Sequence, residues 1–165
     1  LTNLSDNFSI NELVDTTLSK NSQKTSEIIN ESNYKSEDVI LILRTFLQRA
    51  KRLLNLYEEQ NENLSVDSLI DNYKPPIFWK DKPIVKKQLE NWSKSKIENL
   101  IININTRQFL HNANYAVRNS NYAVAPYIAI TDLYESKKIL DTIYKSLDEK
   151  IIGSKYGIQL KKMVE

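Results

Sequence analysis

Residues 36–60 read SEDVILILRTFLQRAKRLLNLYEEQ, and the apolar side chains in this stretch recur at steps of three and four residues. That spacing places them on one face of an α-helix, with most of the basic and amide side chains on the other. Ser36 is a residue type that caps helix N-termini, and Glu37 and Asp38 follow it where the positive end of the helix dipole favours carboxylates. The stretch therefore predicts an amphipathic helix of about seven turns, long enough to be the central helix of a bundle.

Helix signals continue on both sides of this stretch. Ser9 begins a capping box, Ser65 precedes a short apolar run, and Pro83 suits the first turn of a helix. The two prolines at 75–76 interrupt the helical pattern because proline has no N–H to donate, and we expect the apolar residues 77–79 that follow them to be buried. The predicted helices cover residues 9–19, 22–33, 36–60, a short segment from 65, 81–91, a segment from Ser93 or Ser95 through Leu110, and a last helix from about Pro126 to Gly153.

These helices predict an all-α fold, a bundle of about six to eight helices. Residues 101–106 also have β-propensity, but a lone strand without a pairing partner is not expected. We expect one helical domain over residues 1–133, and residues 134–165 as a C-terminal helix and tail that belong to this domain or extend it. The parts of the domain are the helical hairpin 9–33, the central helix 36–60 and the helices within 65–133.

The composition excludes several kinds of functional site. The 165 residues contain two glycines, no cysteine and one histidine. Gly153 and Gly157 belong to neither of the common glycine-rich patterns that cradle phosphates, and His111 alone does not form a histidine metal site. We therefore expect no cofactor and no metal, and the absence of cysteine suits a cytoplasmic protein. No apolar run is long enough to span a membrane, and the Leu1 start leads us to expect a piece of a longer protein.

Candidate catalytic residues are few. His111 is the one side chain whose unperturbed pKa lies near neutrality, but no nucleophile pattern accompanies it. Adjacent residues on a helix point about 100° apart, so neighbouring carboxylates do not converge on one substrate atom. We therefore expect no enzymatic activity from this chain. The carboxylate pairs considered are Glu37 with Asp38, Glu58 with Glu59, and Asp148 with Glu149.

Charge is divided unevenly along the chain. Residues 1–73 contain 7 basic and 12 acidic side chains, a net charge of −5, whereas residues 74–165 contain 16 and 9, a net charge of +7. A basic segment attracts phosphates or an acidic partner. Two tryptophans lie among lysines in residues 79–92, a pattern typical of nucleic-acid binding through stacking and phosphate contacts. The alternative interpretation makes these lysines the ordinary outer face of a helix, with Trp79 and Trp92 as core anchors.

Four short segments occur in an order that resembles a known protein family. They read VILILRTFLQRAKRLL at 39–54, KPPIFWK at 74–80, KP at 82–83 and LENWS at 89–93. Their order is similar to that in the C-terminal collar domain of the delta subunit of bacterial DNA polymerase III, the clamp-loader subunit. In that family LLRxLxRxxxRLL precedes RPPxFFK, a basic helix and a WS helix start. FSINELVD at 8–15 resembles the first helix of the same domain, so the resemblance covers about residues 8–133.

The resemblance implies a non-catalytic structural domain within the clamp loader, which places the sliding clamp on DNA during replication. It implies the delta-prime and tau/gamma subunits as partners, bound by helix packing, with DNA contact only indirect and no membrane contact. The chain departs from the family at Gln108 and Asn112, where a Glu-x-x-x-Lys pattern is usual. The family-like motif comprises Pro75, Pro76, Phe78, Trp79 and Trp92. The residues considered for subunit or DNA contact are Arg44, Arg49, Arg52, Lys80, Lys82, Lys86 and Lys87.

Residues 39–43 add a physical expectation to the resemblance. They are apolar on nearly every side of the predicted helix, which is more than one internal seam needs. A collar needs such positions for its neighbours, so we expect an exposed apolar patch. The second hypothesis is a helical nucleic-acid-binding module that uses the basic segment from Lys80 to Lys96.

Overall fold

The computed structural model of the chain describes residues 4–36, 38–60 and 64–165. These residues form ten α-helices and no β-strand, so the predicted all-α fold is confirmed, with more helices than expected. None of these helices is both long and apolar enough to cross a lipid bilayer. The helices are α1 (Leu4–Leu18), α2 (Ser22–Glu31), α3 (Asp38–Glu59), α4 (Val66–Asn72), α5 (Lys82–Asn91), α6 (Lys94–Arg118), α7 (Val124–Asp132), α8 (Lys137–Ser146), α9 (Glu149–Ile152) and α10 (Lys155–Val164).

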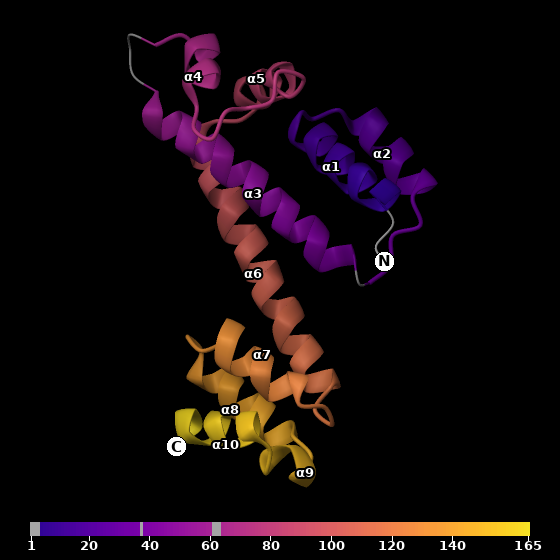
Figure 1. The fold of residues 1–165 in the computed structure, drawn as a ribbon, viewed down its shortest axis with the longest axis vertical. Helices are drawn as coiled ribbons and strands as arrows, with labels where there is room; N and C mark the ends of the chain where they lie inside the picture. The colour runs from indigo at the N-terminus through magenta and orange to yellow at the C-terminus, as the bar shows by residue number, and fades with distance from the viewer. Residues whose placement is uncertain (1–3, 37, 61–63) are drawn as a thin grey trace. The chain divides into compact units, whose positions relative to one another are not determined.

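The chain divides into two compact units, Leu1–Ile104 and Asn105–Glu165, and the division falls within α6 (Figure 1). We call them the first and the second unit. Each has its own hydrophobic core. The domain boundary expected at residue 133 stays a prediction, and Leu133 itself is fully buried in the core of the second unit.

The first unit begins with the expected helical hairpin of α1 and α2, and α1 also packs against α3 and α5. Asn21 caps α2, since its side chain accepts the Lys24 N–H at 3.2 Å. From Ile10 onward the apolar positions of α1 recur at helical spacing and are buried, which fastens the hairpin to its neighbours. They are Ile10, Leu13, Val14 and Leu18.

The main core of the first unit forms around the second half of α3. Leu53 and Leu56 are buried there among side chains from α4, α5 and the start of α6. Each large apolar side chain removed from water in this way stabilises the fold by about 1.5–3 kcal/mol. The other buried members are Leu69, Ile70, Tyr73, Ile77, Val85 and Ile97.

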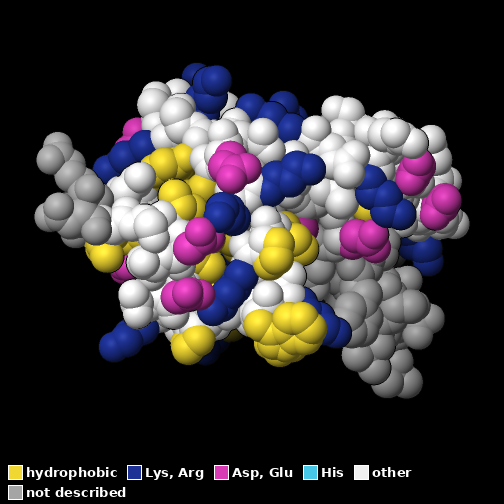
Figure 2. Space-filling view, turned by 90° about the horizontal axis from the view of Figure 1, so that it is seen from above, with side chains coloured by type: hydrophobic (Ala, Val, Ile, Leu, Met, Phe, Trp, Pro, Cys, Tyr) yellow, Lys and Arg dark blue, Asp and Glu magenta, His cyan; other side chains and the backbone are white. Residues whose placement is uncertain are grey.

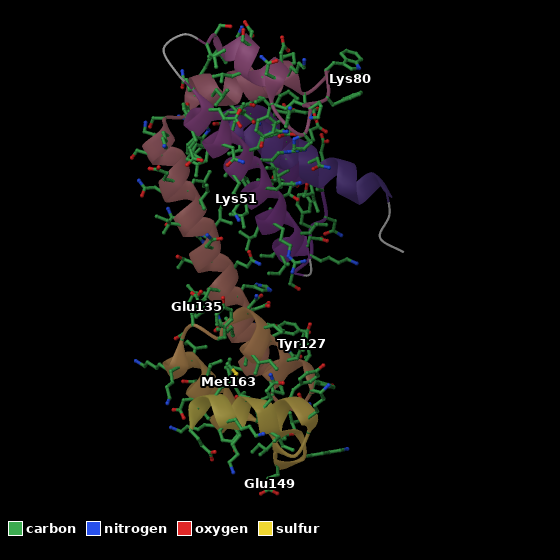
Figure 3. The ribbon with its side chains drawn as sticks, turned by 60° about the vertical axis from the view of Figure 1, so that its left-hand side comes forward. Lys51, Lys80, Tyr127, Glu135, Glu149 and Met163 are labelled. Atoms are coloured by element: carbon green, nitrogen blue, oxygen red, sulfur yellow. The ribbon has the colours of Figure 1, made fainter. Side chains whose placement is uncertain are left out.

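The second unit packs α10 against α7, α8 and α9 (Figure 1). The buried side chains that α6 contributes to its core are alanines, Ala113 and Ala116, whereas α8 and α10 contribute Leu140, Ile143 and Leu160. Met163 of α10 is packed against this core from the side, and Figure 3 shows it directed into the unit.

Several predicted helix signals are confirmed. Ser65 caps α4 by accepting the Ser68 N–H at 3.2 Å, and Pro83 lies in the first turn of α5. Residues 101–106, despite their β-propensity, continue the helix α6. Local propensity is a weak prior, and the surrounding helical pattern prevails here.

One predicted helix start is wrong. α1 begins at Leu4, so Ser9 lies inside the helix and does not begin it, because no proline or glycine precedes it to stop the helix. α3 is described from Asp38, and the Asp38 carboxylate accepts the Lys35 N–H at 2.8 Å. The role expected for Glu37 lies outside the described residues.

The single last helix expected from Pro126 to Gly153 is also wrong, because this segment forms α7, α8 and α9. The chain leaves the helical conformation at Leu133, with φ −124° and ψ 9°, and at Leu147, with φ −69° and ψ 141°. Both leucines are buried in the core of the second unit. The two turns bring them into one core with Leu140, so burial outweighs the continuation of the helix.

Gly157 permits a close approach between helices in the second unit. It is buried in the first turn of α10, where Ser154 caps the helix. A Cβ atom at this position would lie 2.1 Å from the Ile151 carbonyl oxygen and 2.6 Å from that of Ile152. Only glycine therefore lets α10 lie this close to α9.

We expect Gly157→Ala to destabilise the second unit by about 2 kcal/mol, because the added methyl group forces α10 away from α9. Gly153→Ala is the matched control, since its Cβ would meet nothing closer than 3.9 Å and its φ of −75° suits alanine. Thermal unfolding followed by circular dichroism measures both variants. Equal midpoints for the two would contradict the close packing of α10 on α9.

Candidate functional site

The loop between α4 and α5 carries the family-like motif, and it buries one of its three apolar side chains. Ile77 is buried in the core of the first unit, but Phe78 is 59% and Trp79 67% exposed. The expectation that these two aromatic residues are buried is therefore wrong. Once Ile77 has filled the core position, the chain turns, with the Asp81 N–H bonded to the Phe78 carbonyl at 2.8 Å, and the next two side chains face solvent.

The exposed aromatic residues form a small cluster with a lysine. The ring centroids of Phe78 and Trp79 are 5.7 Å apart, and Lys80 Nζ lies 5.3 Å from the centroid of the Trp79 ring. Figure 3 shows Lys80 at the outer end of this loop. Pro75 and Pro76 are exposed beside it, and the Lys74–Pro75 peptide is cis. We call Phe78, Trp79 and Lys80 the aromatic loop.

Two of the lysines considered for nucleic-acid contact are bound to carboxylates of α4. Lys82 Nζ lies 2.5 Å from Asp71 Oδ1, and Lys86 Nζ lies 2.8 Å from Asp67 Oδ2. The hydrogen bond that Lys86 donates to the Asp67 carboxylate, and the negative charge of that carboxylate, raise the pKa of Lys86. These ion pairs connect α4 to α5, and the carboxylates partly neutralise the positive charges of the two lysines. Lys87 is exposed.

Basic side chains do not form a continuous surface on the face seen in Figure 2. Acidic side chains lie among the basic ones there, and the hydrophobic patches are separate from one another. Phosphate binding by charge alone needs several cations without acidic neighbours. The aromatic loop is therefore the stronger candidate for nucleic-acid contact than the lysines of α5.

Trp92 is a structural anchor, as one interpretation of the sequence expected. Its indole N–H donates to the Leu18 carbonyl at 2.7 Å, which ties the end of α1 to the turn between α5 and α6. The Tyr57 hydroxyl donates to the carbonyl oxygens of Trp92 and Leu89, the latter at 2.7 Å. Burial raises the pKa of Tyr57. Lys20 Nζ covers the Trp92 ring at 5.2 Å from its centroid.

Arg49 and Arg52 lie in a polar cluster inside the first unit. Arg49 Nε is 3.3 Å from Asp15 Oδ1, an ion pair without hydrogen-bond geometry. Gln88 is fully buried, and its amide donates to the backbone carbonyl and to Oδ1 of Asp15, both at 3.2 Å. Burial, and then the charge of Arg49, lower the pKa of Arg52. We call Asp15, Arg49, Arg52 and Gln88 the Asp15 cluster.

The Asp15 cluster changes the interpretation of the arginines. It holds α1, α3 and α5 together, so Arg49 and Arg52 serve the interior of the unit. Arg44 differs: it is exposed and forms no ion pair with another described residue. Sequence reasoning missed Gln88, although its spacing of three residues from Val85 and four from Trp92 places it on the inward side of α5.

A groove of about 510 Å³ runs between α1 and α5. Its wall mixes carboxylates, hydroxyls, an amide, a lysine and two apolar residues. Among the described residues no three His, Cys, Asp or Glu side chains are close enough together to hold a metal ion. The groove is lined by Glu12, Asp15, Thr16, Ser19, Asn21, Pro83, Ile84 and Lys87.

The catalytic candidates of the sequence are divided between the two units. His111 is half-buried on α6, and Glu58 with Glu59 ends α3 in solvent. Asp148 and Glu149 are exposed at the start of α9, and Figure 3 shows Glu149 at the edge of the second unit.

The first half of α3 carries apolar side chains that belong to neither of the two hydrophobic cores of the described residues. Val39 and Leu41 are each 38% exposed, and their apolar neighbours are only half-buried. The fully buried residues of α3, Ala50, Leu53 and Leu56, all lie in its second half. We call the set that follows the α3 apolar face. Its members are Val39, Ile40, Leu41, Ile42, Leu43, Phe46 and Leu47.

Comparison with known proteins identifies no relative of this chain. No protein-family model, no curated protein and no solved structure matches it. The family resemblance found in the sequence therefore stays a prediction, and function is argued from the surfaces described above.

We expect Asp15→Ala to lower the free energy of unfolding by about 2 kcal/mol, because it removes the carboxylate that pairs with Arg49 and one of the two acceptors of the buried Gln88 amide. The loss is smaller than for a fully buried pair, since both charged side chains keep some contact with water. Denaturant unfolding of the purified chain gives the value. The control is Asp67→Ala, which breaks the exposed pair with Lys86 and should leave the midpoint nearly unchanged; a larger loss for the control would contradict the structural role of the Asp15 cluster.

Proposed function

We propose that this chain is a helical collar domain of the delta subunit of a bacterial DNA polymerase III, and that it helps to assemble the clamp loader. In this function it is a scaffold without chemistry of its own. Its partners are the delta-prime and tau/gamma subunits, and it binds them by packing helices against theirs. The order of the segments at 39–54, 74–80 and 89–93 supports the proposal.

The observation that carries the proposal is the exposure of the α3 apolar face. A helix that keeps apolar side chains partly in water over more than two turns is stabilised when another protein covers them. The second half of α3 shows what such coverage does, because Leu53 and Leu56 are fully buried there. In a scaffold domain we expect a long helix to pack one half into the core of the domain itself and to bind a neighbouring protein with the other half.

We expect Ile40→Ser combined with Leu43→Ser to weaken binding to the delta-prime and tau/gamma subunits by about tenfold, because two half-buried apolar side chains on one side of α3 no longer lose water on binding. Biolayer interferometry with the purified subunits measures the affinity, and circular dichroism checks that helix content is unchanged.

The matched control is Ile158→Ser, which removes an exposed apolar side chain of α10 in the second unit. It should leave the affinity within about twofold of the wild type. If the wild-type protein binds none of the loader subunits, the proposed function is wrong.

A second function, contact with single-stranded or primer-template DNA, is favoured by the aromatic loop. An exposed tryptophan stacks on a base of any sequence, and a lysine beside it reaches a phosphate. Lys80 and Trp79 have this arrangement, whereas Lys82 and Lys86 are bound to carboxylates of α4. Contact of this kind is local and does not need a broad basic surface.

If the aromatic loop binds DNA, Trp79→Ala reduces the affinity by about tenfold, since stacking on one base contributes about 1–3 kcal/mol. Fluorescence anisotropy of a labelled primer-template, measured at several salt concentrations, gives the affinity. Tyr134→Ala, which removes an exposed aromatic residue of the second unit, is the control. Absence of wild-type binding at low salt would exclude this second function.

A further inference from the structure

A heptad pattern runs along α3 from its exposed half into its buried half. Apolar residues recur every seven positions in two rows, which is the a and d pattern of helices that pack lengthwise against another helix. In the second half of α3, two members of these rows, Leu54 and Tyr57, are packed against the core of the first unit. In the first half of α3, Ile40, Leu43 and Leu47 are half-buried and belong to neither of the two cores of the described residues. Ala50, which follows them in the pattern, is fully buried. The rows are Ile40, Leu47 and Leu54, and Leu43, Ala50 and Tyr57.

Charged side chains follow the first row at a fixed distance. Arg44, Lys51 and Glu58 each lie four residues after a member of that row, which is the e position of a heptad. All three are exposed. Within the part of the chain that the structure describes, Arg44 and Lys51 form neither an ion pair nor a hydrogen bond. Figure 3 shows Lys51 midway along α3.

Residues at e positions set which helix binds and in which direction, through ion pairs across the interface. Two exposed cations about 10 Å apart along the helix axis therefore favour a partner with carboxylates at the same spacing. Arg49 and Arg52 do not contribute to this charge pattern, since they lie in the Asp15 cluster.

We infer that the first half of α3 is a docking surface for an amphipathic helix that carries two carboxylates one heptad apart. The apolar side of that helix covers Ile40, Leu43 and Leu47, and its carboxylates pair with Arg44 and Lys51. The inference rests on the proposed function, because the helix belongs to a neighbouring clamp-loader subunit. It adds the chemistry of that partner and the residues that recognise it.

The test uses the full-length protein with purified delta-prime and tau/gamma subunits. Arg44→Glu combined with Lys51→Glu should weaken the complex by at least about tenfold, because two attractive pairs become repulsive. The control is Lys137→Glu combined with Lys138→Glu, which makes the same change of charge on exposed residues of α8 and should stay within about twofold of the wild type. Biolayer interferometry gives the affinities, and circular dichroism confirms that both variants are folded.

Salt dependence gives a second measurement. The wild-type complex should weaken as sodium chloride rises, and the Arg44→Gln and Lys51→Gln double variant should lose most of that dependence. If the wild type assembles but the α3 and α8 charge reversals have equal effects, the inference is wrong and the proposed function stands. If the wild type does not assemble at all, both are wrong.

Discussion

Burial of the second half of α3 is the interaction on which the first unit depends. Leu53 and Leu56 lie in a core to which α4, α5 and α6 all contribute. Among the described residues, no other helix of the unit places two fully buried large side chains in that core. The Asp15 cluster and the Trp92 anchor then fasten α1 to this core from the side. These contacts use the second half of α3 or its neighbours, and none of them involves the α3 apolar face.

The long helix and the all-α class could be predicted from the sequence. The apolar side chains of α3 recur every three or four residues over its 22 residues, and this spacing is typical of an α-helix and not of a β-strand. The breaks after α7 and α8 could not. Leu133 and Leu147 continue the apolar stripe in phase, so the local pattern favours one helix, and only their burial in a shared core explains the turns. Tertiary packing overrides local preference in that segment.

Part of the candidate site was also accessible from the sequence. The spacing of the apolar residues indicated that residues 39–43 exceed the needs of one seam, and the structure leaves Val39 and Leu41 partly exposed. The roles of the charged residues were not accessible, because Arg44, Arg49 and Arg52 look alike in the sequence. Only the position of Asp15 and the buried Gln88 separates the two internal arginines from the external one. The roles of Trp79 and Trp92 also differ only in the structure: the turn after Ile77 exposes Trp79, whereas Trp92 bonds to the Leu18 carbonyl.

Hydrogen–deuterium exchange of the protein with and without the delta-prime and tau/gamma subunits tests the central claim most directly. If the first half of α3 is an assembly surface, peptides that cover residues 38–48 become protected from exchange in the complex, while those that cover α8 exchange at an unchanged rate. Formation of the complex without protection of residues 38–48 would contradict the account, because the apolar face of α3 would then have no role in assembly.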